Sequence, residues 1–232
     1  MNFQFINGIK TFIPNSNNEL IDHAIENKKI LFAINAEKII KSSNSQKSII
    51  NKNFGYPDGI GAVWELRKRG FKNVKKIAGC DLWLGIVDRY YLSKSFYLIG
   101  ARQDIIEKTA KKLRKQYGGI KIINYRNGYF DNKEDYESLY EDIVRNKPDI
   151  IFVAMGSPIQ EKLIINLQNL HEATYMGLGG SFDIYAGKLK RAPDIFINLN
   201  LEWAFRLIKE PKRLSRQLSL IPFFFKVLLR RL

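Results

Sequence analysis

The sequence has little of what disulfide-rich, zinc-binding and membrane-spanning proteins need. Its single cysteine, Cys80, excludes an internal disulfide bond and a cysteine-rich metal site, and is expected to be a buried or loop thiol. Its two histidines, His23 and His171, stand far apart in the sequence, build no zinc site and receive no role. No run of 18 uncharged apolar residues predicts a simple membrane-spanning helix. The first 15 residues lack the long apolar segment of a signal peptide.

The common nucleotide-binding motifs are also absent. The sequence contains neither GxxxxGK[ST] nor GxGxxG, so it has no P-loop and no dinucleotide fingerprint. It contains no Asp-x-Asp pair that would hold a divalent ion beside a nucleotide diphosphate. Any sugar-nucleotide chemistry is therefore expected to run without a metal. We also expect no cofactor.

A strong excess of positive charge is present. The 232 residues carry a formal net charge of +15, and 45% of them are hydrophobic, enough for a real core. A basic excess favours polyanionic partners: nucleic acid, nucleotide phosphates or an anionic membrane surface. From Leu201 to the end, eight basic residues stand against Glu202 and Glu210, so this segment alone contributes +6.

The order of expected elements predicts an α/β fold. The first half is predicted to begin with a hairpin at Asn7-Gly8, a helix at 18–27 and a strand at 29–34. A partly helical segment at 38–53 and a turn at 55–61 follow. One helix then continues from this turn to residue 69, and another begins at residue 81 and ends at about 93. From residue 95, strands at 95–99, 120–124, 149–154 and 173–178 alternate with helices at 103–117, 133–146 and 158–170. Such alternation predicts a mainly parallel sheet flanked by helices. We expect an α/β domain over residues 1–190 and a basic helical appendage over 191–232.

The stretch Ile151–Glu161 is the centre of this pattern. It combines a buried strand, a tight turn and a helix start, and ligands of open α/β sheets lie at the carboxyl ends of strands. Gly156, Ser157 and Gln160 are therefore expected to face a ligand. An ordinary strand-to-helix turn explains the same residues equally well.

Two carboxylates lie in other glycine-containing loops. Asp58, between Pro57 and Gly59, is either a turn former or a general base on a glycine-lined loop. Asp183 follows the glycine-rich turn 177–180, and a place in the first turn of a helix, where the helix dipole favours a carboxylate, explains it without a further role.

The C-terminal stretch has an amphipathic pattern. Apolar residues occupy one side of an expected helix and basic residues the opposite side. Pro222 is expected to divide or kink this helix. We favour an interfacial membrane helix, with a helix packed on the core or against another copy in a homo-oligomer as the alternatives. The apolar face comprises Leu214, Leu218, Ile221, Phe225, Leu228 and Leu232.

Several motifs, in order over residues 30–216, resemble the WecG/TagA/CpsF family of bacterial glycosyltransferases, glycosyltransferase family 26. The pair GSPxQE and GKxxRAP…LEWxxRL is the most specific part of the resemblance. The matching pieces are Asn35-Ala36-Glu37, Pro57-Asp58-Gly59-Ile60-Gly61, Gly79-Cys80-Asp81-Leu82, Leu98-Ile99-Gly100-Ala101, Asn127-Gly128-Tyr129-Phe130, 156–161, 177–183, 187–193, 201–203 and 206–207.

The resemblance implies a Rossmann-like core and an inverting, metal-independent transferase. It implies transfer of a sugar, typically N-acetylmannosamine or its uronic acid, from a UDP-sugar to undecaprenyl-diphosphate-linked N-acetylglucosamine. The product would be a lipid-linked intermediate of teichoic acid, enterobacterial common antigen or capsule. The expected location is cytoplasmic, peripheral on the inner face of the bacterial cell membrane.

The resemblance also implies roles for individual residues. Asp58 would be the general base, and Gln160 and Asn35 would hold donor or acceptor hydroxyls. Lys76 stands where relatives often have arginine, which keeps the charge but loses the bidentate fork, and Ala33 stands where they often have threonine, so the donor sugar stays open. The remaining implied contacts are Gly179, Gly180 and Asp183 along the nucleotide, Arg191 and Arg206 at the diphosphate, and Arg213 and Arg216 on the acceptor side.

Three alternatives remain. One is the same fold with a different UDP-hexose donor for capsule or exopolysaccharide. Another is a nucleic-acid-binding protein, although the sequence has no recognisable recognition module, and we expect no nucleic-acid partner. The last is a non-catalytic membrane scaffold, against which the presence of both Asp58 and Gln160 argues.

Overall fold

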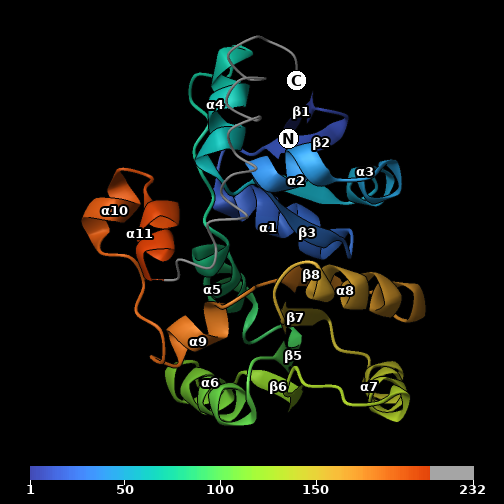
Figure 1. The fold of residues 1–232 in the computed structure, drawn as a ribbon. Helices are drawn as coiled ribbons and strands as arrows, with labels where there is room; N and C mark the ends of the chain where they lie inside the picture. The colour runs from blue at the N-terminus through green and yellow to red at the C-terminus, as the bar shows by residue number, and fades with distance from the viewer. Residues whose placement is uncertain (210–232) are drawn as a thin grey trace. The chain divides into compact units, whose positions relative to one another are not determined.

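The computed structural model describes residues 1–209 (Figure 1). Its strands form a mostly parallel sheet in the order β1-β2-β4-β3-β8-β7-β5-β6. Only the β1–β2 pair is antiparallel among the pairs β1–β2, β2–β4, β3–β8, β8–β7, β7–β5 and β5–β6. The expected Rossmann-like α/β class is therefore confirmed. The chain divides into two compact units, and the first comprises Met1–Ile13, Ala33–Ala78 and the described chain from Lys190 onward.

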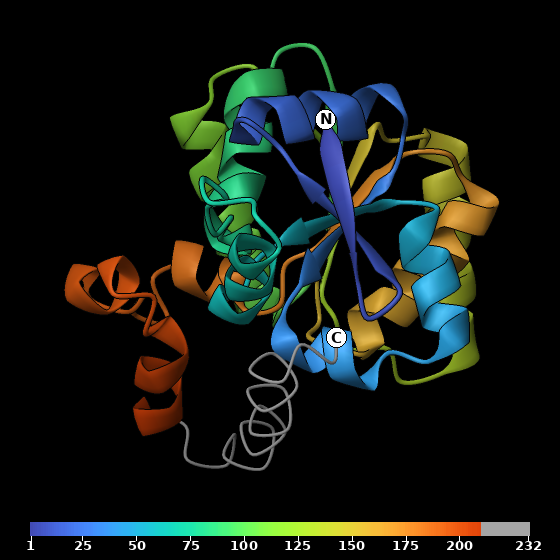
Figure 2. The same ribbon diagram turned by 90° about the horizontal axis from the view of Figure 1, so that it is seen from above.

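The first unit begins with the predicted hairpin. Asn7 and Gly8 connect its two strands with positive φ angles of 48° and 77°. Helix α3 packs on β2 and β4, and α4 packs on β1 and β4 from the other side (Figure 2). The unit's elements are β1 (Asn2–Ile6), β2 (Ile9–Ile13), the end of β3 (Ile30–Ile34), α2 (Ala36–Lys41), α3 (Asn44–Asn51), β4 (Phe54–Pro57), α4 (Ile60–Lys68), α10 (Asp194–Asn198) and α11 (Glu202–Lys209).

Strand β4 corrects one sequence prediction. The segment 55–61 was expected to be a turn, but Phe54–Pro57 is a strand that runs parallel to β2. Gly55 is needed because a Cβ atom there would lie 2.6 Å from the carbonyl oxygen of Lys10 on the neighbouring strand. A glycine required by close strand approach therefore looked like a turn glycine.

The second unit contains the regular strand–helix part of the chain, Pro14–Phe32 and Gly79–Leu189. Helix α6 packs on β5 and β6, while α8 packs on β7 and β8 and also contacts α7. The two sets of helices lie on opposite sides of the strands (Figure 1). The elements are α1 (Asn17–Glu26), the start of β3, α5 (Gly79–Tyr90), β5 (Ser95–Gly100), α6 (Gln103–Gln116), β6 (Lys121–Arg126), α7 (Lys133–Asn146), β7 (Ile150–Ala154), α8 (Ile159–Leu170), β8 (Thr174–Gly177) and α9 (Ser181–Tyr185).

The core of the second unit is centred on β7. All five residues of this strand are buried, as a central parallel strand covered on both faces requires. The ring of Trp83 on α5 lies 5.6 Å from Phe152 on β7 and 5.6 Å from Phe182 on α9, in edge-on contacts. Aromatic packing therefore ties α5 and α9 to the strand whose carboxyl end carries the turn at Gly156.

The described chain beyond β8 contains helices joined by loops, as expected. The second unit ends at Leu189, and the predicted domain boundary at residue 190 stays a prediction. The predicted amphipathic stretch from Leu214 to Leu232 lies outside the described residues. Among residues 1–209, no helix is both long and apolar enough to cross a membrane.

Candidate functional site

The Asp58 loop lies at the carboxyl end of β4. The backbone N–H groups of Asp58 and Gly59 both donate to the carbonyl of Ile34, at 3.1 and 3.4 Å. Ile34 is the last residue of β3, so the exits of β3 and β4 are joined through one carbonyl oxygen. The side chain of Asp58 is half-buried, and its backbone is fixed on both sides of the loop.

Asn35 lies directly beside this loop. Its Oδ1 caps α2 by accepting from the N–H of Lys38 at 2.9 Å, which fixes the orientation of the amide. Within residues 1–209 its NH₂ group donates no hydrogen bond. A Cβ atom on Gly59 would lie 3.1 Å from the Cβ of Asn35, so the two loops are in contact. The first unit therefore brings a half-buried amide donor next to the Asp58 loop.

A cluster of charges borders the same loop. Ile77 donates its N–H to the carbonyl of Pro57 at 2.8 Å, which places Lys76 beside the segment that carries Asp58. The Lys76 ammonium is paired with one carboxylate oxygen of Glu202, and the two side chains are only 14% and 12% exposed. The Nε of Arg191 lies 4.0 Å from the other oxygen of Glu202. Lys76 and one of the predicted diphosphate contacts, Arg191, thus share one carboxylate.

Three predicted arginines cannot be placed in this cluster. Arg206 lies in α11, but its side chain is outside the described part of the structure. Arg213 and Arg216 lie outside the described residues altogether. Their expected contacts with diphosphate and acceptor stay predictions.

Gln160 joins two turns of the second unit. It stands in the first turn of α8 and is 8% exposed. Its Oε1 accepts from the N–H of Gly156 at 3.1 Å and from the N–H of Gly179 at 2.9 Å. Because both donors are backbone groups, the amide orientation is determined, and Nε2 is left without a hydrogen bond among the described residues. Gln160 thus fixes the loops after β7 and β8, and its expected contact with a substrate hydroxyl would have to use Nε2.

The two turns that Gln160 joins have open space beside them. Gly156 and Gly179 have positive φ angles of 76° and 57°, which favour glycine. A Cβ atom on Gly156, Gly179 or Gly180 would meet no other atom within 4 Å. Ser157 is exposed and precedes a cis proline. The N–H of Gly156 is already used by Gln160, so phosphate binding by this turn would depend on other groups.

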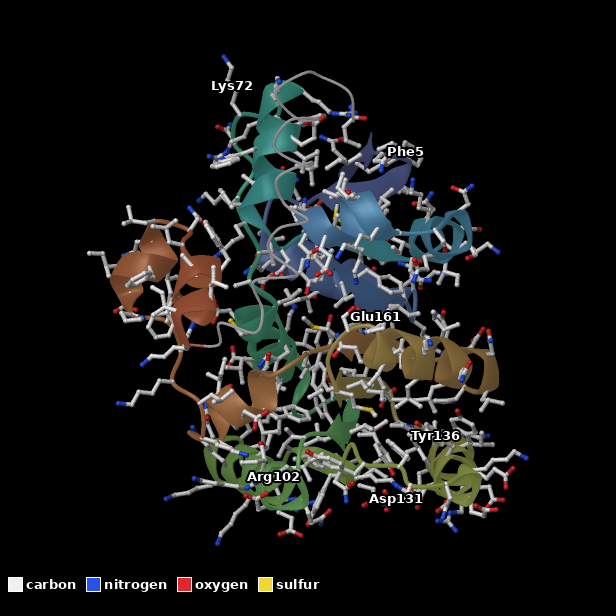
Figure 3. The ribbon with its side chains drawn as sticks, in the orientation of Figure 1. Phe5, Lys72, Arg102, Asp131, Tyr136 and Glu161 are labelled. Carbon is white, nitrogen blue, oxygen red and sulfur yellow. The ribbon has the colours of Figure 1, made fainter. Side chains whose placement is uncertain are left out.

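Asp183 lies in the first turn of α9, as the sequence suggested. Its half-buried carboxylate makes no hydrogen bond or ion pair within residues 1–209. Arg102, at the start of α6 (Figure 3), is a neighbouring cation that sequence analysis assigned no role. A hydrogen bond to Asp104 raises the pKa of Arg102, and weaker attractions from Tyr129 and Asp183 act in the same direction. The turns after β5, β6 and β8 thus place Arg102, Tyr129 and Asp183 within electrostatic range.

Glu202 is the functional candidate that the sequence analysis missed. It had been counted only as an acid within a basic segment and as part of the LEW motif. Its partner Lys76 is 126 residues away, so no local pattern could join them. The other predicted residues fall into two groups, Asn35, Asp58, Lys76 and Arg191 in the first unit, and Gly156, Ser157, Gln160, Gly179, Gly180 and Asp183 in the second.

No obvious cation site accompanies these residues. In the part of the chain that the structure describes, no three or more His, Cys, Asp or Glu side chains gather in a way that could hold a metal ion. Cys80 is half-buried on α5 and forms no disulfide.

Comparison with known proteins supports the resemblance seen in the motifs. The family model described as "Glycosyl transferase WecG/TagA/CpsF family" matches residues 9–232. A relative from Bacillus subtilis (strain 168), named N-acetylglucosaminyldiphosphoundecaprenol N-acetyl-beta-D-mannosaminyltransferase, is 41% identical over 182 residues, which cover 77% of this chain and 69% of the relative. The chain belongs to the WecG/TagA/CpsF family of glycosyl transferases.

Proposed function

We propose that the protein transfers an N-acetylmannosamine-type sugar from a UDP-sugar to undecaprenyl-diphosphate-linked N-acetylglucosamine. The acceptor and the sugar follow the name of the 41% identical relative. The UDP donor, inversion at the anomeric carbon and independence of metal and cofactor are our inferences. The product would be a lipid-linked disaccharide for a cell-surface polymer such as teichoic acid.

In the proposed reaction, Asp58 is the general base. Its carboxylate takes the proton of the acceptor hydroxyl while that oxygen attacks the anomeric carbon of the donor. The bond between the anomeric carbon and the diphosphate oxygen breaks, and UDP leaves from the opposite face with an additional negative charge. Lys76 and Arg191 would stabilise that charge, as fixed cations do at leaving phosphates. Asn35 and the Nε2 of Gln160 would donate to sugar hydroxyls.

One observation carries the proposal. The half-buried carboxylate of Asp58 stands on a loop fixed by three backbone hydrogen bonds. One of these bonds comes from Ile77, and the residue before Ile77 is Lys76, a cation paired with Glu202. A base needs a fixed position, and a diphosphate leaving group needs cations nearby. Both needs are met within the first unit.

The test is Asp58→Asn, with Asp88→Asn on the exposed face of α5 as the control. An amide cannot take the proton, so we expect kcat to fall by about 10²–10⁴-fold, while the control keeps its rate. Transfer of radiolabelled sugar from UDP-N-acetylmannosamine to a short-chain polyprenyl-diphosphate-N-acetylglucosamine provides the measurement. Full activity of Asp58→Asn would reject the base assignment.

The identity of the donor needs a separate measurement. Lys76 cannot form the bidentate contact that an arginine would offer, so a different UDP-hexose is the runner-up donor. A panel of UDP-sugars with the same lipid acceptor ranks them by kcat/KM. A donor other than UDP-N-acetylmannosamine at the top of that ranking would change the substrate but not the reaction type.

We also propose that the C-terminal appendage binds the anionic inner face of the cell membrane. The segment 211–232 carries six basic residues and no acidic one, and each basic residue near such a surface contributes about 1 kcal/mol. The preceding helices α10 and α11 add exposed apolar side chains, with Ile195 65% and Ile208 68% exposed. A subunit interface made by the same residues is the alternative.

Removing residues 211–232 tests this membrane contact. The shortened protein should no longer sediment with vesicles of phosphatidylglycerol and phosphatidylcholine, whereas full-length protein should sediment with these but not with pure phosphatidylcholine. Lys111→Gln and Lys115→Gln, on the exposed face of α6, are charge controls that should leave sedimentation unchanged. Unchanged sedimentation of the shortened protein, with a loss of oligomer in sizing, would favour the subunit interface.

A further inference from the structure

We propose that Glu202 is a positioning residue for sugar transfer: its carboxylate holds Lys76 and Arg191 in place to receive the diphosphate of the donor. This inference rests on the proposed function and assigns Glu202 a role within it. Glu202 itself would not touch the substrate. It would act through the two cations and, by way of Lys76, on the loop that carries Asp58.

The geometry gives each carboxylate oxygen a separate task. Oε2 pairs with the Lys76 ammonium, and Oε1 faces the Nε of Arg191 at 4.0 Å. One rigid, planar group thus sets the distance between two cations that come from parts of the chain more than a hundred residues apart. Without it, Lys76 and Arg191 would repel each other, because like charges at short range disfavour a shared location.

Glu202 and Lys76 are mostly buried, so the loss of either charge would disturb the arrangement. Glu202 is 12% exposed and Lys76 14% exposed, while Arg191 keeps 34% of its side chain accessible. Removing one partner of a mostly buried pair leaves an uncompensated charge, which is far more disruptive than losing a surface pair. The partly accessible Arg191 is the member of the cluster that solvent, and therefore an anion, can reach.

The position of Glu202 in α11 also favours this role. It is the first residue of the helix, where the helix dipole favours a negative side chain. The helix start is anchored by Leu201, which donates its N–H to the carbonyl of Phe196 at 2.7 Å, and the rings of Phe196 and Phe205 pack 5.4 Å apart. The carboxylate is therefore presented from a fixed helix end and not from a free loop.

A short path joins Glu202 to the base. Lys76 is followed by Ile77, which is 5% exposed and donates its N–H to Pro57, the residue before Asp58. A displacement of Lys76 would therefore be passed to the end of β4. This path makes the appendage helix α11 part of the catalytic arrangement, although its residues lie far from Asp58 in sequence.

The decisive comparison is the binding of UDP and of uridine to the full-length protein by calorimetry. For Glu202→Gln we expect UDP to bind about 10-fold more weakly, a change equivalent to about 1.4 kcal/mol, and uridine, which lacks phosphates, to bind as in the wild type. In steady-state assays the same variant should raise the donor KM more than it lowers kcat. Glu137→Gln, which removes the carboxylate of an exposed pair with Lys133 on α7, is the matched control and should change neither.

A second variant distinguishes the positioning of the Lys76 cation from a contribution of the ion pair to protein stability. The exchange Lys76→Glu with Glu202→Lys restores an ion pair, so it should recover most of the melting temperature lost in Glu202→Gln, less the repulsion between the new ammonium and Arg191. It moves the cation to another position, so it should not recover UDP affinity. Recovery of both would show that the pair is only structural and would overturn the inference.

The other outcomes are equally clear. Glu202→Gln binding UDP as tightly as the wild type would reject the inference alone. Tighter binding would mean that the carboxylate competes with the diphosphate for the cations, which also rejects it. A wild-type protein that binds no UDP and transfers no sugar would reject the proposed function itself.

Discussion

The two units hold their candidate loops by different kinds of contact. In the second unit, a neutral and buried amide, Gln160, joins the turns after β7 and β8 through two backbone N–H groups. In the first unit, the segment next to the Asp58 loop is held by a mostly buried ion pair between Lys76 and Glu202, with Arg191 close by.

The difference corresponds to what each group of residues is proposed to do. A neutral amide fixes backbone without adding charge, which suits turns with open space beside them at Gly156 and Gly179. A carboxylate beside two cations fixes their positions, which suits the stabilisation of a leaving diphosphate. We therefore expect changes to Gln160 to act mainly on stability and changes to Glu202 mainly on phosphate affinity.

The largest stability effect should follow from Gln160→Leu. Leucine removes the acceptor of both the Gly156 and Gly179 N–H groups, and each unsatisfied buried donor costs about 1–3 kcal/mol. We expect the free energy of unfolding to fall by about 2–4 kcal/mol in urea titrations, since these turns are partly reached by water. Gln103→Leu, at an exposed position on α6, should change it by less than about 0.5 kcal/mol.

Gln160→Glu sharpens the comparison. A carboxylate can accept from the same two N–H groups at a helix start, so this variant should keep the fold within about 1 kcal/mol of the wild type. It loses the Nε2 donor, so a role in holding a sugar hydroxyl would appear as reduced kcat/KM in a stable protein. If Gln160→Leu unfolds with the same free energy as the wild type, Gln160 does not hold the turns after β7 and β8 together.

The elements of the second unit can be predicted from the sequence more closely than those of the first, for a physical reason. In the second unit, strands such as β5 and β7 are continuous buried runs separated by helices and by glycine-containing turns, so their positions were predicted within one or two residues. In the first unit, β4 is four residues long and contains both Gly55 and Pro57. Its glycine serves the approach of a neighbouring strand, which only the folded chain reveals.

The candidate residues follow the same division. The residue types at Asp58, Gln160 and Asp183 are suggestive in sequence because each stands close to glycines, and Gln160 and Asp183 also follow expected strands. The hydrogen bond from the N–H of Gly179 to Gln160 and the ion pair of Glu202 with Lys76 could not be predicted, since 19 and 126 residues separate the partners. Such contacts depend on how strands are ordered in the sheet, and periodicity does not determine that order.

A smaller effect is expected at the opposite end of the second unit's strands, where a charged contact does occur. Asp149, just before β7, accepts from the N–H and hydroxyl of Ser95 at 2.9 and 2.7 Å, and Lys94 lies 3.6 Å away. Partial burial raises the pKa of Asp149, but the hydrogen bonds from Ser95 and the attraction of Lys94 outweigh it, so the pKa is lowered. A carboxylate with a lowered pKa in the folded protein stabilises the fold above its unfolded pKa, near 3.8, and this contribution is lost as the pH falls through the folded value.

Asp149→Asn should therefore lower the stability at neutral pH and make the further loss of stability on acidification smaller. The Gln160 contact should stay intact. We expect a loss of about 1 kcal/mol at neutral pH, a modest value because the Asp149 side chain is 43% exposed and solvent screens it. Urea titrations at a series of pH values down to the acid transition should show a flatter decline for the variant than for the wild type. Gln160→Leu should lower stability by the same amount at every pH, because an amide does not titrate. A pH-dependent deficit in Gln160→Leu, or an unchanged acid slope in Asp149→Asn, would mean that the neutral and the charged contacts of this unit are not independent.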